Sequence, residues 1–180
     1  MSRQPEKARD WEQAVRFHGH TCPGLAIGYR AAKIALERLG AKRSEDEELI
    51  AIAETDSCAV DAVQWLSGCT FGKGNLFFRD YGKHVFTFAL RPSGRAVRVA
   101  LRLGQSEEPV GHPENETELI LNAPAEALFD IREMTIDLPP AAQIRDSLAC
   151  DACGELVMVG RTVSDRGRTL CIPCSQEQSR

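Results

Sequence analysis

Apolar and polar residues follow a helical period in three segments of the first half of the chain. The pattern predicts a short helix over residues 8–17, a longer one over 23–39 and a third over 58–66. Pro23 suits the first turn of the second helix, because its missing N–H is not needed there. Gly40 follows that helix where a C-cap glycine is expected. Three helices are therefore predicted before residue 70.

The clearest strand pattern lies in the middle of the chain. Apolar residues occupy alternate positions over 85–90 and again over 97–103, and the turn-forming residues 92–94 separate the two runs. This arrangement is typical of a two-stranded hairpin with one apolar face. A continuous apolar run over 49–53 indicates a further, buried strand.

The remaining segments complete the fold prediction. Residues 105–113 are expected to form a loop and residues 116–131 a fourth helix. Helices and strands mix without a repeated strand–helix–strand crossover, which predicts the α+β class. Two prolines at 139 and 140 mark a boundary. We therefore expect an N-terminal domain over 1–140, which mixes helices with an antiparallel sheet, and a small C-terminal module over 141–180, similar to a zinc ribbon or treble clef.

Composition narrows the class of protein. The chain has 180 residues, of which 43% are hydrophobic and 27% charged, as in a soluble globular protein. No apolar run approaches the roughly 20 residues that cross a bilayer, and the first residues lack the apolar stretch of a signal peptide. We therefore expect a cytoplasmic protein without a membrane partner, whose seven cysteines are metal ligands or functional thiols rather than disulfides.

Four cysteines near the C-terminus form the most specific motif. They follow the spacing C-x2-C-x17-C-x2-C and are Cys150, Cys153, Cys171 and Cys174. Four thiolates fill the tetrahedral coordination of zinc and leave no open position, which predicts a structural zinc site. Between the pairs, residues 157–159 and 168–170 are expected to form a hairpin around the turn 164–167. The alternative is four free or disulfide-linked cysteines.

A second group of ligand-type residues lies near the N-terminus. His18 and His20 are separated by one glycine and followed closely by Cys22. If the next proline begins the helix, Cys22 is its N-cap, where the helix dipole and free N–H groups favour a thiolate. Cys58 begins the next predicted helix, and Asp61 shares its face. A thiolate beside imidazoles is a good site for a borderline divalent metal.

Other interpretations of these residues are open. Cys58 and Cys69 could be buried small hydrophobes, and the two clustered histidines could cap neighbouring helices. Cys22 could instead act as a nucleophile with a histidine as base, without a metal. His84, which opens a strand, and His112, which precedes a proline, are expected to be ordinary surface residues.

The motifs resemble those of the FmdE family, which takes its name from formylmethanofuran dehydrogenase. The resemblance covers nearly the whole chain and rests on residues 17–24 (FHGHTCPG) with Gly28, 56–64 (DSCAVDAVQ), 68–76 (GCTFGKGNL) and 80–83 (DYGK). It implies an α+β, usually dimeric domain with a metal-capable pocket near the His-Gly-His-x-Cys segment, and many members append a four-cysteine zinc module. The pocket residues that it implies are His18, His20, Cys22 and Cys58, with Asp61, Gln64 and Cys69 nearby.

Two classes of function follow. The leading hypothesis is a homodimeric zinc protein whose N-terminal pocket holds a second divalent metal, catalytic or sensory, binds a small molecule and serves molybdenum or tungsten enzymes. In a catalytic version, the catalytic residues are Cys22, Cys58 and Asp61: two or three of His18, His20, Cys22 and Cys58 would hold the metal and leave one position open, and Asp61 would orient a ligand or act as a base. The alternative is a regulatory or scaffold zinc-finger protein that binds a protein or nucleic-acid partner. Nucleic acid is the less favoured partner, because the net charge is −4 and the tail has no basic stripe.

Overall fold

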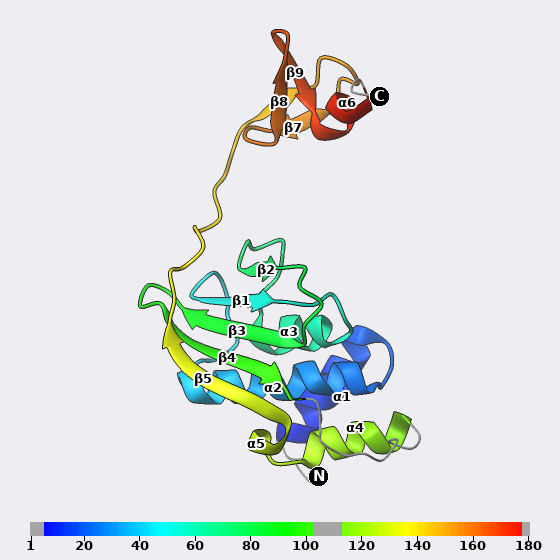
Figure 1. Cartoon of the computed structure of the whole chain (residues 1–180), viewed down its shortest axis with the longest axis vertical. Helices are drawn as coiled ribbons and strands as arrows, with labels where there is room; N and C mark the ends of the chain where they lie inside the picture. Colours follow the sequence, from blue (N-terminus) through cyan, green and yellow to red (C-terminus); the bar gives the residue numbers. More distant parts are fainter. Residues whose placement is uncertain (1–5, 103–112, 178–180) are drawn as a thin grey trace. The chain divides into compact units, whose positions relative to one another are not determined.

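The computed structural model describes residues 6–102 and 113–177, which fall into two compact units, one ending at Ala142 and the other beginning at Gln143. Figure 1 shows the elements of both units. The described helices include none that is both long and apolar enough to span a membrane. The first unit contains α1 (Glu6–His18), α2 (Pro23–Leu39), β1 (Leu49–Ala53), α3 (Ala59–Ser67), β2 (Leu76–Phe78), β3 (Val85–Leu90), β4 (Arg95–Leu101), α4 (Pro113–Asn122), α5 (Ala125–Leu128) and β5 (Phe129–Thr135).

The first unit is built on one five-stranded sheet with the order β2-β1-β3-β4-β5. β1 pairs with β2 in parallel, and the other neighbours are antiparallel. The predicted hairpin is confirmed as β3 and β4, and the predicted buried strand as β1. Mixed helices and a largely antiparallel sheet confirm the α+β class.

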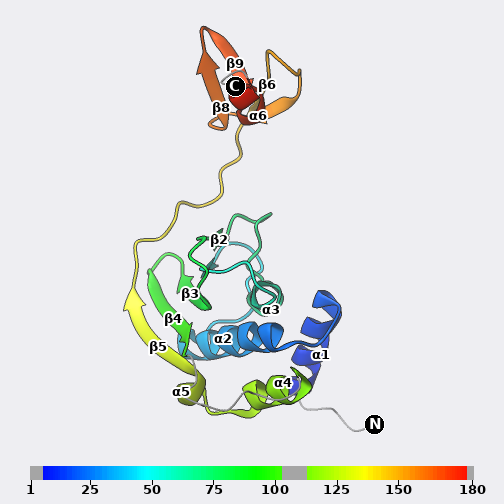
Figure 2. The same cartoon turned by 45° about the vertical axis from the view of Figure 1, so that its right-hand side comes forward.

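The main core lies between the sheet and the helices. α2 contacts β3 and β4, while α1, α3 and α4 pack around α2. Figures 1 and 2 show these helices gathered on one face of the sheet. Phe86 and Phe88 of β3 and Val97 and Val99 of β4 are the alternate residues that enter this core. The apolar face predicted for the hairpin is therefore the face that α2 covers.

Helix ends follow local chemistry. Cys22 precedes Pro23 in an extended conformation and caps α2, and Gly40 ends the helix with a φ of 62°. Gly68 ends α3 with a φ of 72° and donates its N–H to the Gln64 carbonyl. Because glycine adopts positive φ without steric cost, both ends are where the sequence predicted them.

The predicted helix over 116–131 is wrong in its second half. α4 ends at Asn122, and a short helix follows Pro124, which has no N–H to continue a helix. Residues 129–135 instead form β5, which pairs with β4 along seven residues. The three-residue β2 was not predicted, because it is too short to show alternation. The predicted loop over 105–113 lies outside the described residues except for Pro113, which begins α4.

The second unit consists of two small hairpins and a short helix. Its elements are β6 (Ser147–Ala149), β7 (Leu156–Met158), β8 (Thr162–Asp165), β9 (Arg168–Cys171) and α6 (Ile172–Glu177). The predicted turn near 164–167 is present, with φ of 48° at Arg166 and 80° at Gly167. The predicted first arm is wrong: β8 pairs with β9, whereas β7 pairs with β6. The apolar run around 157 had an upstream partner that local sequence did not reveal.

Candidate functional site

Three helix ends converge on one cluster of potential metal donors in the first unit. His18 ends α1, Cys22 caps α2 and Cys58 precedes α3, while His20 lies between the first two helices. One donor atom from each of these four residues lies within 4.8 Å of the other three. The sequence placed these residues at helix ends, and the packing of α1, α2 and α3 brings the ends together.

Cys22 and His20 are positioned by the backbone at and before the start of α2. The Cys22 sulfur accepts a hydrogen bond from the Leu25 N–H at 3.4 Å, so the N-terminus of α2 directs positive potential at it. Gly19 has a φ of 100°, which lets the chain turn sharply after α1 and brings the His20 ring within 4.4 Å of the His18 ring, measured between centroids. A side chain at residue 19 would strain this turn.

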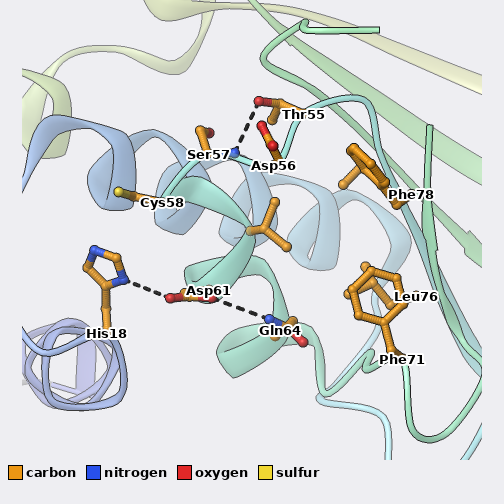
Figure 3. Close-up of a pocket in the computed structure, with 12 residues that line it drawn as sticks. His18, Thr55, Asp56, Ser57, Cys58, Asp61, Gln64, Phe71, Leu76 and Phe78 are labelled. Carbon is orange, nitrogen blue, oxygen red and sulfur yellow. Dashed lines mark hydrogen bonds and ion pairs between the residues drawn. The ribbon is translucent and has the colours of Figure 1, made fainter. Parts of the chain in front are cut away.

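A carboxylate fixes the orientation of His18. The Asp61 carboxylate accepts a hydrogen bond from His18 Nδ1 at 2.7 Å, and Gln64 donates to the other Asp61 oxygen at 3.4 Å. His18 Nε2 then faces the Cys22 sulfur at 3.8 Å. Carboxylate–histidine pairs of this kind hold metal-ligating imidazoles in one tautomer and leave the second nitrogen free for the metal. Figure 3 shows the Asp61 bridge between His18 and Gln64.

Close contact between α2 and α3 brings the two cysteines together. A Cβ at Gly28 would lie 2.0 Å from the Ala59 carbonyl oxygen, and a Cβ at Gly24 would lie 3.2 Å from the Cys58 Cβ. Only glycine permits this approach at position 28. Partial burial raises the pKa of the Cys58 thiol, and the neighbouring Cys22 sulfur is the second cause that raises it. Two thiolates this close repel each other unless a cation lies between them.

A cavity of about 440 Å³ adjoins the cluster. His18 and Cys58 form part of its wall, and Figure 3 shows Phe71, Leu76 and Phe78 opposite them. The described residues that line it are His18, Ala53, Thr55, Asp56, Ser57, Cys58, Val60, Asp61, Gln64, Phe71, Leu76 and Phe78. The aromatic residues of this wall were not predicted, because they lie in loop and edge positions without a distinctive pattern.

The four tail cysteines also meet in space. Their sulfurs lie within 4.8 Å of one another, and Gly154 turns the chain after the first pair with a φ of 76°. The backbone N–H of Cys171 donates to the Cys150 sulfur at 3.3 Å, and that of Cys174 donates to the Cys171 sulfur at 3.4 Å. Hydrogen bonds from backbone N–H groups, of which that of Cys153 has the largest effect, lower the pKa of Cys150 to about 6. The neighbouring cysteine sulfurs, that of Cys171 most strongly, raise the pKa of Cys174.

Comparison with known proteins identifies the family. A family model described as FmdE, molybdenum formylmethanofuran dehydrogenase operon, matches residues 17–135, more than half of the chain. The chain belongs to the FmdE family. A protein of Archaeoglobus fulgidus named probable S-adenosyl-L-methionine-binding protein is 33% identical over 193 residues, which cover 91% of this chain and 51% of that relative. The chain thus spans about half the length of this curated relative.

The fold of this FmdE chain also matches a solved structure. The crystal structure of a tungsten formylmethanofuran dehydrogenase FmdE-like protein from Syntrophus aciditrophicus has a TM-score of 0.73 and 25% identity, with 100% of both chains covered. The FmdE family model contains all four N-terminal donors and ends before the tail cysteines. The matched segment therefore includes the N-terminal cluster, whereas the four tail cysteines lie outside it.

Two other residues of the FmdE chain lie away from both clusters. Cys69 is fully buried, and its thiol donates a hydrogen bond to the Leu49 carbonyl at 3.4 Å. Burial raises the pKa of this thiol to about 11. Its position matches the interpretation as a buried small hydrophobe rather than a residue of the pocket. His84 is half-buried rather than an ordinary surface residue, with a buried Nδ1 that finds no hydrogen-bond partner in the described part of the chain. His112 lies outside the described residues.

Proposed function

We propose that this chain is a two-metal protein in which the N-terminal cluster binds a divalent ion beside a ligand pocket. The observation that carries this proposal is the convergence of His18, His20, Cys22 and Cys58, with the Asp61 carboxylate accepting a hydrogen bond from His18 Nδ1. Two imidazoles and two thiolates suit zinc or another borderline divalent ion. A bound ion would supply Lewis-acid chemistry, or a ligand-dependent signal, at the end of the cavity.

The protein side chains have distinct tasks in this proposal. His18 and Cys22 are half-buried and held by hydrogen bonds, whereas His20 is exposed in the loop. His20 is therefore the donor that can most easily give way to an incoming ligand. Asp61 holds the His18 tautomer, a positioning task rather than that of a general base, because one of its oxygens is occupied by the 2.7 Å bond.

The tail cluster is proposed to hold a structural zinc. In the second unit the buried core consists of Leu170 with Cys150 and Cys171, so burial alone provides little stability. A four-thiolate site leaves no position open for a substrate. Metal binding would therefore supply most of the free energy that folds this unit.

The comparisons suggest ligands and context. The solved relative's name supports a role beside tungsten or molybdenum enzymes, and the curated relative's name makes S-adenosyl-L-methionine one compound to test by calorimetry. A cytoplasmic homodimer, which the sequence predicts, belongs to the same proposal. Light scattering on the purified chain measures its oligomeric state directly.

Metal content per chain tests the proposal. Purified parent protein should contain two metals, a Cys153→Ser/Cys174→Ser variant one, and a His20→Ala/Cys22→Ala variant one. Cys69→Ala is the matched control, since this buried cysteine touches neither cluster, and it should keep two. One metal in the parent and none in the tail variant would refute the N-terminal site.

A scaffold role is the second candidate, and one observation favours its protein-binding version. The small second unit exposes several large apolar side chains, among them Leu156 at 76% and Met158 at 48%. Exposed apolar surface suits a protein partner better than a nucleic acid. If this surface forms the dimer contact, Leu156→Ser/Met158→Ser should yield monomers in light scattering. Dimers that persist at the same dissociation constant would exclude it.

A further inference from the structure

The cavity beside the N-terminal cluster has a two-sided lining. His18 and Cys58 form one side, and the rings of Phe71 and Phe78 stand on the other and are 62% and 44% exposed. Val60 and Leu76 extend the apolar wall. This wall therefore suits a ligand with an apolar body.

The charge of the same lining is negative. Asp56 and Asp61 line the cavity, and none of the twelve described residues that line it is lysine or arginine. Asp56 is exposed and forms no ion pair within the described part of the chain. A bound divalent ion would not reverse this sign, because the thiolates of Cys22 and Cys58 cancel its two charges and leave the Asp56 carboxylate uncompensated.

We propose that this pocket binds small organic cations, meaning an ammonium or sulfonium group on an apolar body, and rejects oxyanions. The inference rests on the proposed metal-site function and names the ligand class of that site. Asp56 attracts the charge, and the faces of Phe71 and Phe78 accept it through cation–π contacts. Molybdate, tungstate and phosphate meet like charges in the cavity, so the link to molybdenum or tungsten enzymes does not run through capture of the oxyanion in this pocket.

Calorimetry on the metal-loaded full chain tests this selectivity. Benzyltrimethylammonium is the cationic probe, benzoate carries a similar ring with the opposite charge, and molybdate is the oxyanion. The cation should bind, and the two anions should give no heat. Asp56→Asn should weaken cation binding about tenfold, and Phe71→Ala or Phe78→Ala about threefold each. Asp80→Asn, an exposed aspartate outside the lining, is the matched control and should bind as the parent does.

Metal analysis of the same samples separates the two proposals. If the parent holds two metals but binds benzoate or molybdate as well as the cation, or binds no cation, the ligand class is wrong and the metal site stands. If cation binding is insensitive to Asp56→Asn, the ligand class is also overturned. If the parent holds only the tail metal, the proposed N-terminal metal site fails, and cation binding through Asp56 then describes a pocket without a metal.

Discussion

Gly28→Ala should separate the two helices that carry the cysteines of the N-terminal cluster. The added Cβ would lie 2.0 Å from the Ala59 carbonyl oxygen and 2.7 Å from the Ala59 Cα, both rigid backbone atoms. Helix propensity alone favours alanine over glycine by about 1 kcal/mol. Overpacking of a close contact costs about 1–3 kcal/mol, and a backbone overlap of this depth lies at the upper end. The net expectation is a loss of about 2 kcal/mol.

Thermal unfolding followed by tryptophan fluorescence measures this change. Both tryptophans, Trp11 and Trp65, lie in the first unit, so the signal reports that unit alone. A loss of about 2 kcal/mol lowers Tm by roughly 4–8 °C in a chain of this size. Gly72→Ala is the control, because a Cβ there meets no atom within 4 Å, and its Tm should change little. A Gly28→Ala protein as stable as the parent would show that the gain in helix propensity is not outweighed by overpacking, and that the close contact between the helices is absent.

Three further predictions follow from individual contacts. Asp61→Asn should weaken binding of the N-terminal metal about 10- to 100-fold in a chelator competition, because the histidine loses its orienting carboxylate; Asp80→Asn should not, and equal affinities would refute the orienting role. Metal removal should expose residues 143–177 to protease while the first unit stays protected, and a tail that resists cleavage without metal would contradict a metal-dependent fold. Glu48→Gln should lower Tm at neutral pH, since the N–H groups of Glu48 and Glu45 lower the pKa of that carboxyl from 4.5 to about 2. This stabilisation is present above pH 4.5 and is lost as the pH falls towards 2, so the Tm difference should shrink over that range; a constant difference would contradict it.

Local chemistry explains which parts of the fold were predictable. Pro23 and Gly40 favour the start and the end of a helix through their own backbone conformation, so the ends of α2 could be located from sequence. β5 could not, because its residues form a strand only by pairing with β4, about thirty residues earlier. In the tail, the run around 157 pairs with 147–149 rather than with the next strand. Pairing partners at a distance are the information that periodicity lacks.

The candidate site shows the same division. His18, His20 and Cys22 are close in sequence, so their clustering was evident, whereas the Asp61–His18 bond joins residues 43 apart. Cys58 and Cys69 are the same residue type at opposite ends of one helix, and only their surroundings distinguish a donor position from a core position. No sequence pattern placed Phe71 and Phe78 on the wall of the cavity, because their positions depend on how the loop before β2 folds back.

The positions of the two donor sets along the chain have a consequence for biosynthesis. The N-terminal donors lie within residues 18–58, and the tail donors lie within residues 150–174. A ribosome therefore releases the first set long before the last tail cysteine has been made. Because the two sets belong to separate compact units, the ion proposed for each would bind at a different stage of synthesis.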